Sequence, residues 1–278
     1  MMPYKPKVKA PHPEYVQKMQ DTLREHNLNT VCEAAACPNR AECYKKKSAT
    51  FMILGDICTR ACTFCNVQTG KARQIDTHEP ENLAAAITAL DLKYVVITSV
   101  DRDDLKDYGA GHFAACVRAI KEKKPDIKIE LLTPDFHFHK PSLDTIIQSN
   151  ADKLAHNQET VRRLSKSVRP QSDYTRSLKV LEYYALHSNS RIKSSLMVGL
   201  GESEAELRET MQDLWDVGVR ELTLGQYLQP TPKHQRVEKY YTPEFFAVMK
   251  QEAYSMGFDA VASGVLVRSS YYAEELGR

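Results

Sequence analysis

The 278-residue sequence has no long apolar run and almost no net charge. Its most apolar stretch, residues 83–100, is interrupted by Asp91 and Lys93 and so falls short of the roughly 18 to 20 uncharged apolar residues that span a bilayer. The 38 Lys and Arg residues nearly balance the 36 Asp and Glu residues, which leaves a formal charge of +2. We therefore expect no membrane partner and no nucleic-acid partner.

Targeting signals and nucleotide-binding fingerprints are also missing. Residues 1–13 contain no apolar core of a secretory signal, and the composition of a transit peptide is absent. We therefore expect a cytoplasmic protein, in which cysteines act as ligands or nucleophiles more often than as disulfide partners. No Gly-x-Gly-x-x-Gly follows a predicted strand, which argues against a dinucleotide-binding fold.

Strand-length apolar segments alternate with helix-length amphipathic segments over most of the chain. The pattern predicts strands at 50–54, 93–99, 127–133, 152–156, 193–198 and 221–225. It predicts helices at 81–90, 111–122, 142–148, 159–167, 173–187 and 204–215. Six strand–helix units in series favour an α/β fold, a partial (β/α)6 barrel. An open doubly wound sheet is the alternative that periodicity alone does not exclude.

Two extensions flank the predicted barrel, which we assign to residues 50–226. The N-terminal extension comprises residues 1–49 and contains one predicted helix, 14–26. The C-terminal extension comprises residues 227–278 and has a predicted helix near 243–256. It opens with two prolines, which force extended or turning backbone.

Six of the seven cysteines fall within residues 32–65, in triplets spaced C-x4-C-x5-C (Cys32, Cys37, Cys43) and C-x3-C-x2-C (Cys58, Cys62, Cys65). A structural zinc site needs four ligands, usually from paired C-x2-C knuckles, so zinc is a poor match. Closely spaced thiolates suit an iron–sulfur cluster, and a triplet leaves one iron open to a substrate. The second triplet follows the first strand, at the barrel end where sites are built. The seventh cysteine, Cys116, is predicted to be a small buried side chain of a helix.

The second triplet resembles the signature of the radical S-adenosylmethionine (SAM) superfamily, with the sequence Cys-Thr-Arg-Ala-Cys-Thr-Phe-Cys over residues 58–65. This resemblance implies a 4Fe-4S cluster held by Cys58, Cys62 and Cys65. SAM chelates the open iron of such a cluster, and one electron cleaves it to methionine and a 5′-deoxyadenosyl radical. That radical abstracts hydrogen from an unactivated carbon.

The first triplet is similar to the auxiliary-cluster motif of lipoyl synthases, and other blocks agree with that family at 49–60, 95–105, 156–161, 168–178, 224–234 and 267–275. The resemblance implies a second 4Fe-4S cluster on Cys32, Cys37 and Cys43, with a serine of the 268–271 segment as fourth ligand. We choose Ser270 over Ser269. An adjacent serine pair is by default a surface loop or a cap, so this ligand comes from the resemblance alone.

The resemblance also implies a reaction. Sulfur atoms from the auxiliary cluster are inserted at C6 and C8 of an octanoyl chain, the final step of lipoate biosynthesis. The octanoyl chain is in amide linkage to a lysine of a carrier, such as the glycine cleavage H protein or the E2 subunit of a 2-oxoacid dehydrogenase, or of an octanoyl peptide. An electron donor is a further partner. The protein positions the chain and excludes water from reactive intermediates.

The resemblance to the radical SAM superfamily also implies five candidates for SAM contacts, which lie on or just after predicted strands. Thr98 and Ser99 would meet the amino group, although a helix N-cap is an equal alternative. Asn157 and Lys193 are candidates for the ribose and carboxylate, although a lysine on a strand can also snorkel at an edge. Gly199 would allow adenine to approach the backbone, or would simply form a tight turn.

The sequence departs from the family pattern at three places: Tyr44 replaces a common tryptophan, Tyr108 a common glycine, and residues 154–155 are Leu-Ala in place of Phe-Asn. None of these changes removes a cluster ligand. Two other functions stay open at this point. One is a radical SAM sulfurtransferase with another acyl or peptide substrate, and the other is an electron-transfer or sensing protein without catalysis.

Overall fold

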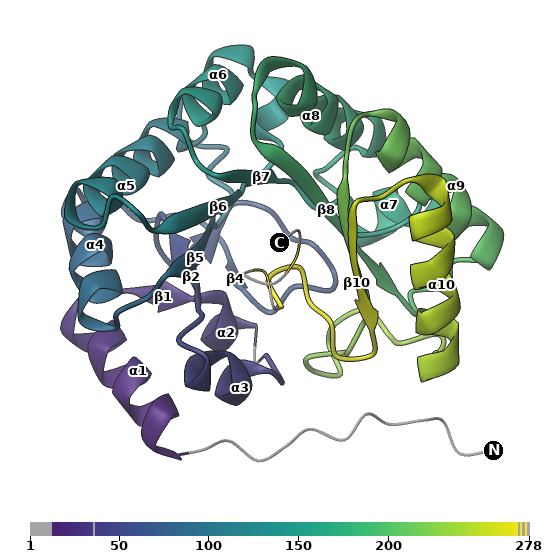
Figure 1. Ribbon diagram of the computed structural model, residues 1–278, viewed down its shortest axis with the longest axis horizontal. Coiled ribbons are helices and arrows are strands. Elements are labelled where there is room, and N and C mark those ends of the chain that lie inside the picture. The colour runs from purple at the N-terminus through teal and green to yellow at the C-terminus, as the bar shows by residue number, and fades with distance from the viewer. Residues whose placement is uncertain (1–12, 36, 272, 274–275, 277–278) are drawn as a thin grey trace. The chain divides into compact units, whose positions relative to one another are not determined.

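The computed structural model describes residues 13–35, 37–271, 273 and 276 (Figure 1). The described chain forms two compact units. The N-terminal unit contains residues 13–60 and 67–154 apart from residue 36, and the C-terminal unit contains 61–66 together with the described residues from 155 onward. Residues 1–12, which open the predicted N-terminal extension and include most of the segment searched for a targeting signal, lie outside the described residues.

The N-terminal unit contains a sheet with the strand order β1-β2-β5-β6. β1 (Asn29–Thr30) pairs antiparallel with β2 (Thr50–Ile53), whereas β5 (Tyr94–Ser99) and β6 (Lys128–Leu132) continue the sheet in parallel. A separate two-stranded sheet joins β3 (Ile57–Cys58) to β4 (Gln68–Thr69).

The helices of this unit come before β2 or follow the parallel strands. α1 (Pro13–Glu25), α2 (Val31–Ala34) and α3 (Arg40–Lys45) come before β2. α4 (Glu79–Ala89), α5 (Ala110–Lys123) and α6 (Lys140–Gln148) lie on the outer side of the strands (Figure 1). A short 3-10 helix, η1 (Phe136–Phe138), precedes α6.

The apolar side of α5 shows how the pattern in the sequence builds this core. Phe113, Cys116 and Ile120 lie three and four residues apart and are fully or almost fully buried. This spacing places them on one face of the helix, against the buried strands. The prediction that Cys116 is a small buried side chain is thereby confirmed, and burial raises the pKa of its thiol.

The chain passes from one unit into the other at β7 (Lys153–Ala155). In the C-terminal unit, β8 (Arg191–Val198), β9 (Glu221–Gln226) and β10 (Ala260–Gly264) are parallel. Its helices are α7 (Arg162–Val168), α8 (Tyr174–His187), α9 (Glu204–Asp216) and α10 (Pro243–Met256). None of the helices within the described residues is long and apolar enough to cross a membrane.

The six predicted strands and the predicted helices are all present, with boundaries that mostly move by one or two residues. The largest shift is at α7, predicted from residue 159 and observed from Arg162. Glu159 has a left-handed φ of 67° and bridges to Leu196 of β8 instead. β10 was not predicted, because its sequence Ala-Val-Ala-Ser-Gly has a single β-branched residue, no aromatic residue and a glycine, which makes its strand propensity weak. It lies within the segment assigned to the C-terminal extension.

The start of α9 offers a test of local stability. The Ser203 hydroxyl accepts a hydrogen bond from the Glu206 amide at 3.2 Å, and the Glu206 carboxylate accepts one from the Ser203 amide at 2.8 Å. Replacing Ser203 by alanine removes this capping box and should lower the free energy of unfolding by about 1 kcal/mol in urea titrations followed by circular dichroism. The matched control is Ser255→Ala, since the Ser255 hydroxyl only bonds to the Gln251 carbonyl within α10. An equal effect of both variants would contradict the capping role.

Candidate active site

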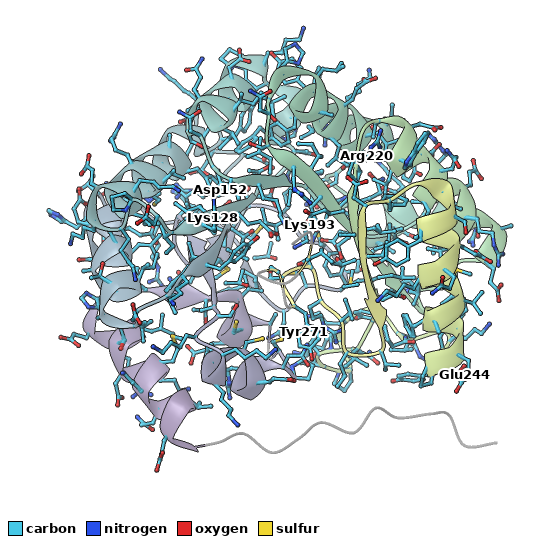
Figure 2. All side chains as sticks on the ribbon, in the orientation of Figure 1. Lys128, Asp152, Lys193, Arg220, Glu244 and Tyr271 are labelled. Carbon is cyan, nitrogen blue, oxygen red and sulfur yellow. The ribbon has the colours of Figure 1, made fainter. Side chains whose placement is uncertain are left out.

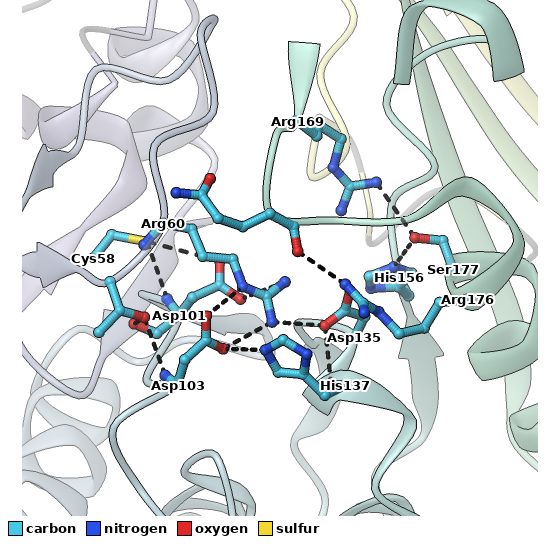
Figure 3. A network of polar contacts seen from close by, with 12 residues as sticks. Cys58, Arg60, Asp101, Asp103, Asp135, His137, His156, Arg169, Arg176 and Ser177 are labelled. Atoms are coloured by element: carbon cyan, nitrogen blue, oxygen red, sulfur yellow. Dashed lines mark hydrogen bonds and ion pairs between the residues drawn. The ribbon is translucent and has the colours of Figure 1, made fainter. Parts of the chain in front are cut away.

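Cys58 lies at the carboxyl ends of two parallel strands of the N-terminal unit. It follows β2 by five residues, and its Sγ accepts hydrogen bonds from the amides of Asp101 at 3.3 Å and Arg60 at 3.4 Å (Figure 3). Asp101 comes two residues after β5. The sequence prediction that the second triplet begins at this end of the barrel strands agrees with this position.

Cys62 and Cys65 lie in a tight turn of the C-terminal unit, in which the Cys65 amide donates to the Cys62 carbonyl at 3.1 Å. Thr63, between them, donates its amide to the Val168 carbonyl at 2.9 Å and accepts the Gln235 amide at 2.9 Å. The turn is therefore held by backbone hydrogen bonds from two distant segments of its own unit. Both cysteines are half-buried.

The aromatic residue of the second triplet anchors the same turn. Phe64 packs against a buried apolar cluster formed by Val168, Leu200 and Tyr227. These contacts give the aromatic position of the C-x3-C-x2-C motif a packing role, since they partly bury a large side chain that lies between two candidate ligands in the sequence.

The first triplet occupies a compact segment of two short helices. Cys32 lies on α2 and Cys43 on α3, and the Cys37 amide donates to the Cys32 carbonyl at 3.1 Å. Cys32 is 7% exposed, and burial raises the pKa of its thiol to about 11. Cys37 also raises it through charge, whereas hydrogen bonds from the Thr50 backbone and the Tyr44 side chain lower it.

Tyr44 and Tyr108, two of the departures from the family pattern, have local roles in the N-terminal unit. Tyr44 is 3% exposed, and its hydroxyl lies 3.3 Å from the Thr30 hydroxyl. Tyr108 has a left-handed φ of 56°, a conformation that glycine adopts without strain. Its ring contacts those of His137 and His139, at centroid distances of 5.3 and 5.8 Å. Tyr108 therefore makes ring contacts that glycine could not make, in a backbone conformation that glycine would adopt with less strain.

The donor set suits soft metals. No disulfide joins any of the seven cysteines, and five of them are half-buried. Thiolates are the ligands that iron–sulfur clusters require. Among the residues described, no group of three or more His, Cys, Asp or Glu side chains is arranged to hold a metal ion. The assignment of both cysteine triplets as cluster ligands therefore stays a prediction, made from the cysteine spacing and the family resemblance.

The residues predicted to contact SAM differ in whether their polar groups already have hydrogen-bond partners within the protein. The Thr98 hydroxyl donates to the Leu132 carbonyl at 2.8 Å, so it already makes a hydrogen bond between β5 and β6. The Ser99 hydroxyl is buried without a hydrogen-bond partner in the described structure, which fits a polar ligand at this position. Neither side chain caps a helix, since both residues belong to β5.

The remaining predicted contacts lie in the C-terminal unit. The Asn157 side chain donates to Glu159 at 3.0 Å. Lys193 lies on β8 and is 1% exposed, so it is a buried lysine rather than a residue snorkelling at a sheet edge (Figure 2). Gly199 has a φ of 101°, and a Cβ there would lie 2.2 Å from Nε2 of Gln226. Its lack of a side chain is thus required by packing within the protein, which favours the tight-turn interpretation.

The serine pair lies in a turn packed on the end of β9. The Tyr271 amide donates to the Arg268 carbonyl at 3.0 Å and closes the turn around Ser269 and Ser270, both half-buried. A Cβ on Gly225 would lie 2.0 Å from the Val267 carbonyl oxygen, so only glycine permits this approach. The turn is therefore seated by backbone contact on a parallel strand.

Sequence reasoning missed the acidic residues that surround Arg60 in the N-terminal unit. The guanidinium, 2% exposed, pairs with Asp101, Asp103 and Asp135 at 3.3, 2.8 and 2.8 Å. The sequence offers one signal for these pairs: Arg60 lies between two candidate ligands, and the 101–104 segment is acidic. Charge patterns alone do not indicate which carboxylates an arginine meets.

Comparisons with known proteins identify the family of this chain. The family model described as the Radical SAM superfamily matches residues 52–214. A curated protein of Burkholderia mallei (strain SAVP1), named lipoyl synthase, is 52% identical over 259 residues, which cover 92% of this chain and 79% of that protein. The chain belongs to the lipoyl synthase family. A lipoyl synthase of Bordetella pertussis is likewise 52% identical, over 91% of this chain and 77% of its own length.

Solved structures confirm the fold class of this lipoyl synthase family member. The crystal structure of methylornithine synthase matches 86% of this chain and 75% of its own, with a TM-score of 0.59 and 12% identity. At that identity the likeness concerns the fold alone. The predicted α/β partial barrel of the radical SAM type is confirmed, and so is the prediction of an enzyme. Family membership implies a 4Fe-4S cluster and SAM as cofactors.

The buried thiol of Cys32 provides a pH-dependent test in cluster-free protein. Its pKa of about 11 lies above the ordinary value of 9.0, so the folded chain holds about a hundredfold less thiolate there than the unfolded chain near neutral pH. Iodoacetamide at pH 8, with peptide mass spectrometry, should label Cys32 about a hundredfold more slowly in folded than in urea-unfolded protein. Because the folded pKa is the higher one, the related stability is complete below pH 9 and declines as the pH rises toward 11. Equal labelling rates would contradict the burial of this thiol.

Proposed function

We propose that this enzyme inserts two sulfur atoms, at C6 and C8, into an octanoyl chain attached to a lysine of a lipoyl carrier protein. The observation that carries the proposal is the presence of both cysteine triplets in a chain that is 52% identical to curated lipoyl synthases over 92% of its length. Glycine cleavage H protein and the E2 subunits of 2-oxoacid dehydrogenases are the proposed carriers. An electron donor completes the set of partners.

Two sets of ligands follow from this proposal. Cys58, Cys62 and Cys65 would hold the cluster that binds SAM, and the auxiliary 4Fe-4S cluster would be held by Cys32, Cys37, Cys43 and Ser270. When bound, the first cluster supplies the electron that cleaves SAM and the second supplies sulfur. The half-buried thiols of the second triplet and the seated turn around Ser270 support these assignments.

For SAM, the buried Ser99 hydroxyl without a partner is the best-supported contact, because a ligand amino group would satisfy it. Buried Lys193 would place a positive charge where a carboxylate could be bound. Asn157 and Thr98 would contribute through polar atoms that already have protein partners. Gly199 would keep its strand end free of a side chain. We assign these contacts to a radical SAM partial barrel of residues 50–226, between an N-terminal extension, 1–49, and a C-terminal extension, 227–278.

The direct test is an anaerobic assay of reconstituted enzyme with a low-potential reductant, SAM and an octanoyl-lysine peptide. Mass spectrometry should show two hydrogens of the peptide replaced by two sulfurs, together with 5′-deoxyadenosine. Cys37→Ala should still cleave SAM but form no thiolated peptide, since it lacks an auxiliary ligand. Cys62→Ala should lose both products. Cys116→Ala is the control, because this buried thiol serves only packing.

The outcomes of this assay separate the alternatives. Deoxyadenosine without thiolated octanoyl peptide would retain radical SAM chemistry and overturn the octanoyl substrate, leaving a sulfurtransferase for another acyl or peptide group. If a preparation that contains iron forms neither deoxyadenosine nor thiolated peptide, the proposed function itself is overturned.

The choice between the two serines is tested by single substitutions. Ser270→Ala should reduce sulfur insertion about tenfold or more, the loss typical of a change in a metal site, with SAM cleavage retained. Ser269→Ala, in the same turn and equally half-buried, is the matched control and should stay close to the parent enzyme. The opposite order of effects, measured by product mass spectrometry and iron content, would move the ligand to Ser269.

A further inference from the structure

Arg60 is a buried cation in the middle of a candidate ligand loop. Its side chain is 2% exposed, and Nε and Nη2 donate to the two carboxylate oxygens of Asp103 at 2.8 Å each (Figure 3). Nη2 also donates to Oδ1 of Asp135 at 2.8 Å, and Nη1 lies 3.3 Å from Oδ1 of Asp101. One guanidinium thus joins the loop after β2 to the loops after β5 and β6.

Asp135 is held in place independently of Arg60. It is fully buried, and its carboxylate accepts the His137 amide at 3.1 Å at the start of η1. The three residues that follow, Phe136, His137 and Phe138, all have left-handed φ values, of 43°, 49° and 58°. Consecutive non-glycine residues in this region are strained and persist only where the surroundings determine them. The partner of Arg60 is therefore a rigid part of the unit.

The charges around the network come from three loops. Asp103 also lies 3.0 Å from Nε2 of His137, which is itself 37% exposed. The three aspartates outnumber the single guanidinium, which lies between them and so offsets the repulsion among their carboxylates. A planar fork with five donors can serve three carboxylates at once, whereas a lysine ammonium cannot reproduce that geometry.

The backbone of the same loop meets the candidate ligand. Cys58 Sγ accepts the amides of Arg60 and Asp101, and Oδ2 of Asp101 lies 3.7 Å from it. An unpaired carboxylate at that distance would repel a thiolate. Because the other oxygen of Asp101 pairs with the Arg60 guanidinium, this repulsion is reduced.

Thr59 docks the same loop without a charge. Its amide and hydroxyl both donate to the Asp101 carbonyl, at 3.0 and 2.9 Å, and its hydroxyl accepts the Asp103 amide at 3.0 Å. Removing this hydroxyl would loosen the loop and leave every charge in place. It therefore separates the geometry of the loop from its electrostatics.

We propose that Arg60 is a positioning residue that keeps two backbone N–H donors on the Cys58 sulfur and thereby raises the reduction potential of the SAM-binding cluster. The inference rests on the proposed role of Cys58 as a ligand of that cluster. Reduction adds negative charge to a cluster, and hydrogen bonds to its sulfur ligands stabilise that charge. Arg60 acts through Cys58 and Asp101 and need not touch SAM.

The test is a redox titration of the reconstituted full-length enzyme, followed by the electron paramagnetic resonance signal that changes when SAM is added. Arg60→Lys keeps the charge and loses the fork, and should lower the reduced-to-oxidised ratio about tenfold at a fixed potential, or ~59 mV for one electron. Thr59→Val should also lower the reduced-to-oxidised ratio. Thermal unfolding of each metal-free variant gives a second readout.

The matched control is Arg102→Lys. Arg102 is also buried, at 3% exposure, but it pairs with Asp104 at 2.8 Å and with the Leu54 carbonyl at 3.3 Å. The Arg102→Lys variant should unfold at a lower temperature without a shift in the reduction potential of the cluster.

The possible results are distinguishable. If Arg60→Lys and Thr59→Val unfold at lower temperature with an unchanged potential, Arg60 is only structural and the inference is overturned. A shift in Arg102→Lys as large as that in Arg60→Lys would also overturn it, because the effect would then belong to any buried arginine near these strand ends. If the unmodified enzyme contains iron but no signal that responds to SAM, the proposed function fails instead.

Discussion

A buried ion-pair network around Arg60 is the constraint on which the ligand loop of the N-terminal unit depends. Burying a charge is costly unless partners and hydrogen bonds compensate it, so the guanidinium and the three aspartates have to adopt one geometry together. That geometry fixes the loops after β2, β5 and β6 at the same time. Cys58 ends the short strand β3 in the segment after β2, and its position is therefore set by residues far away in the sequence.

Close approach of backbone to backbone serves a comparable purpose in the C-terminal unit. Gly225 lets the Val267 carbonyl lie directly against β9, and this contact seats the turn that contains Ser269 and Ser270. Backbone bonds of Thr63 to Val168 and Gln235 hold the turn of Cys62 and Cys65. In both places a short polar segment takes its shape from the rigid elements around it, as is usual for sites carried on loops.

The two cysteine triplets differ in their surroundings. Cys32 is buried on a helix beside the Tyr44 side chain, and its thiol is held in the neutral form by desolvation. The cysteines of the second triplet are half-buried, on loops or strand ends. A cluster at the first triplet would have to displace a proton from a buried thiol, because only the thiolate binds iron.

The sequence by itself determined the order of strands and helices, the cysteine spacing and the family, because these depend on local periodicity and on residue types at short range. Strands β2 and β8 and the burial of Cys116 could all be predicted in this way. The tertiary structure alone decided that Arg60 meets Asp103 and Asp135, that residues 136–138 adopt left-handed backbone, and that β10 joins β9. These features depend on partners 39 to 75 residues away, or on neighbours that compensate a locally unfavourable conformation or a weak strand propensity. Local patterns carry no record of such partners, since folding brings them together only when the strand ends assemble.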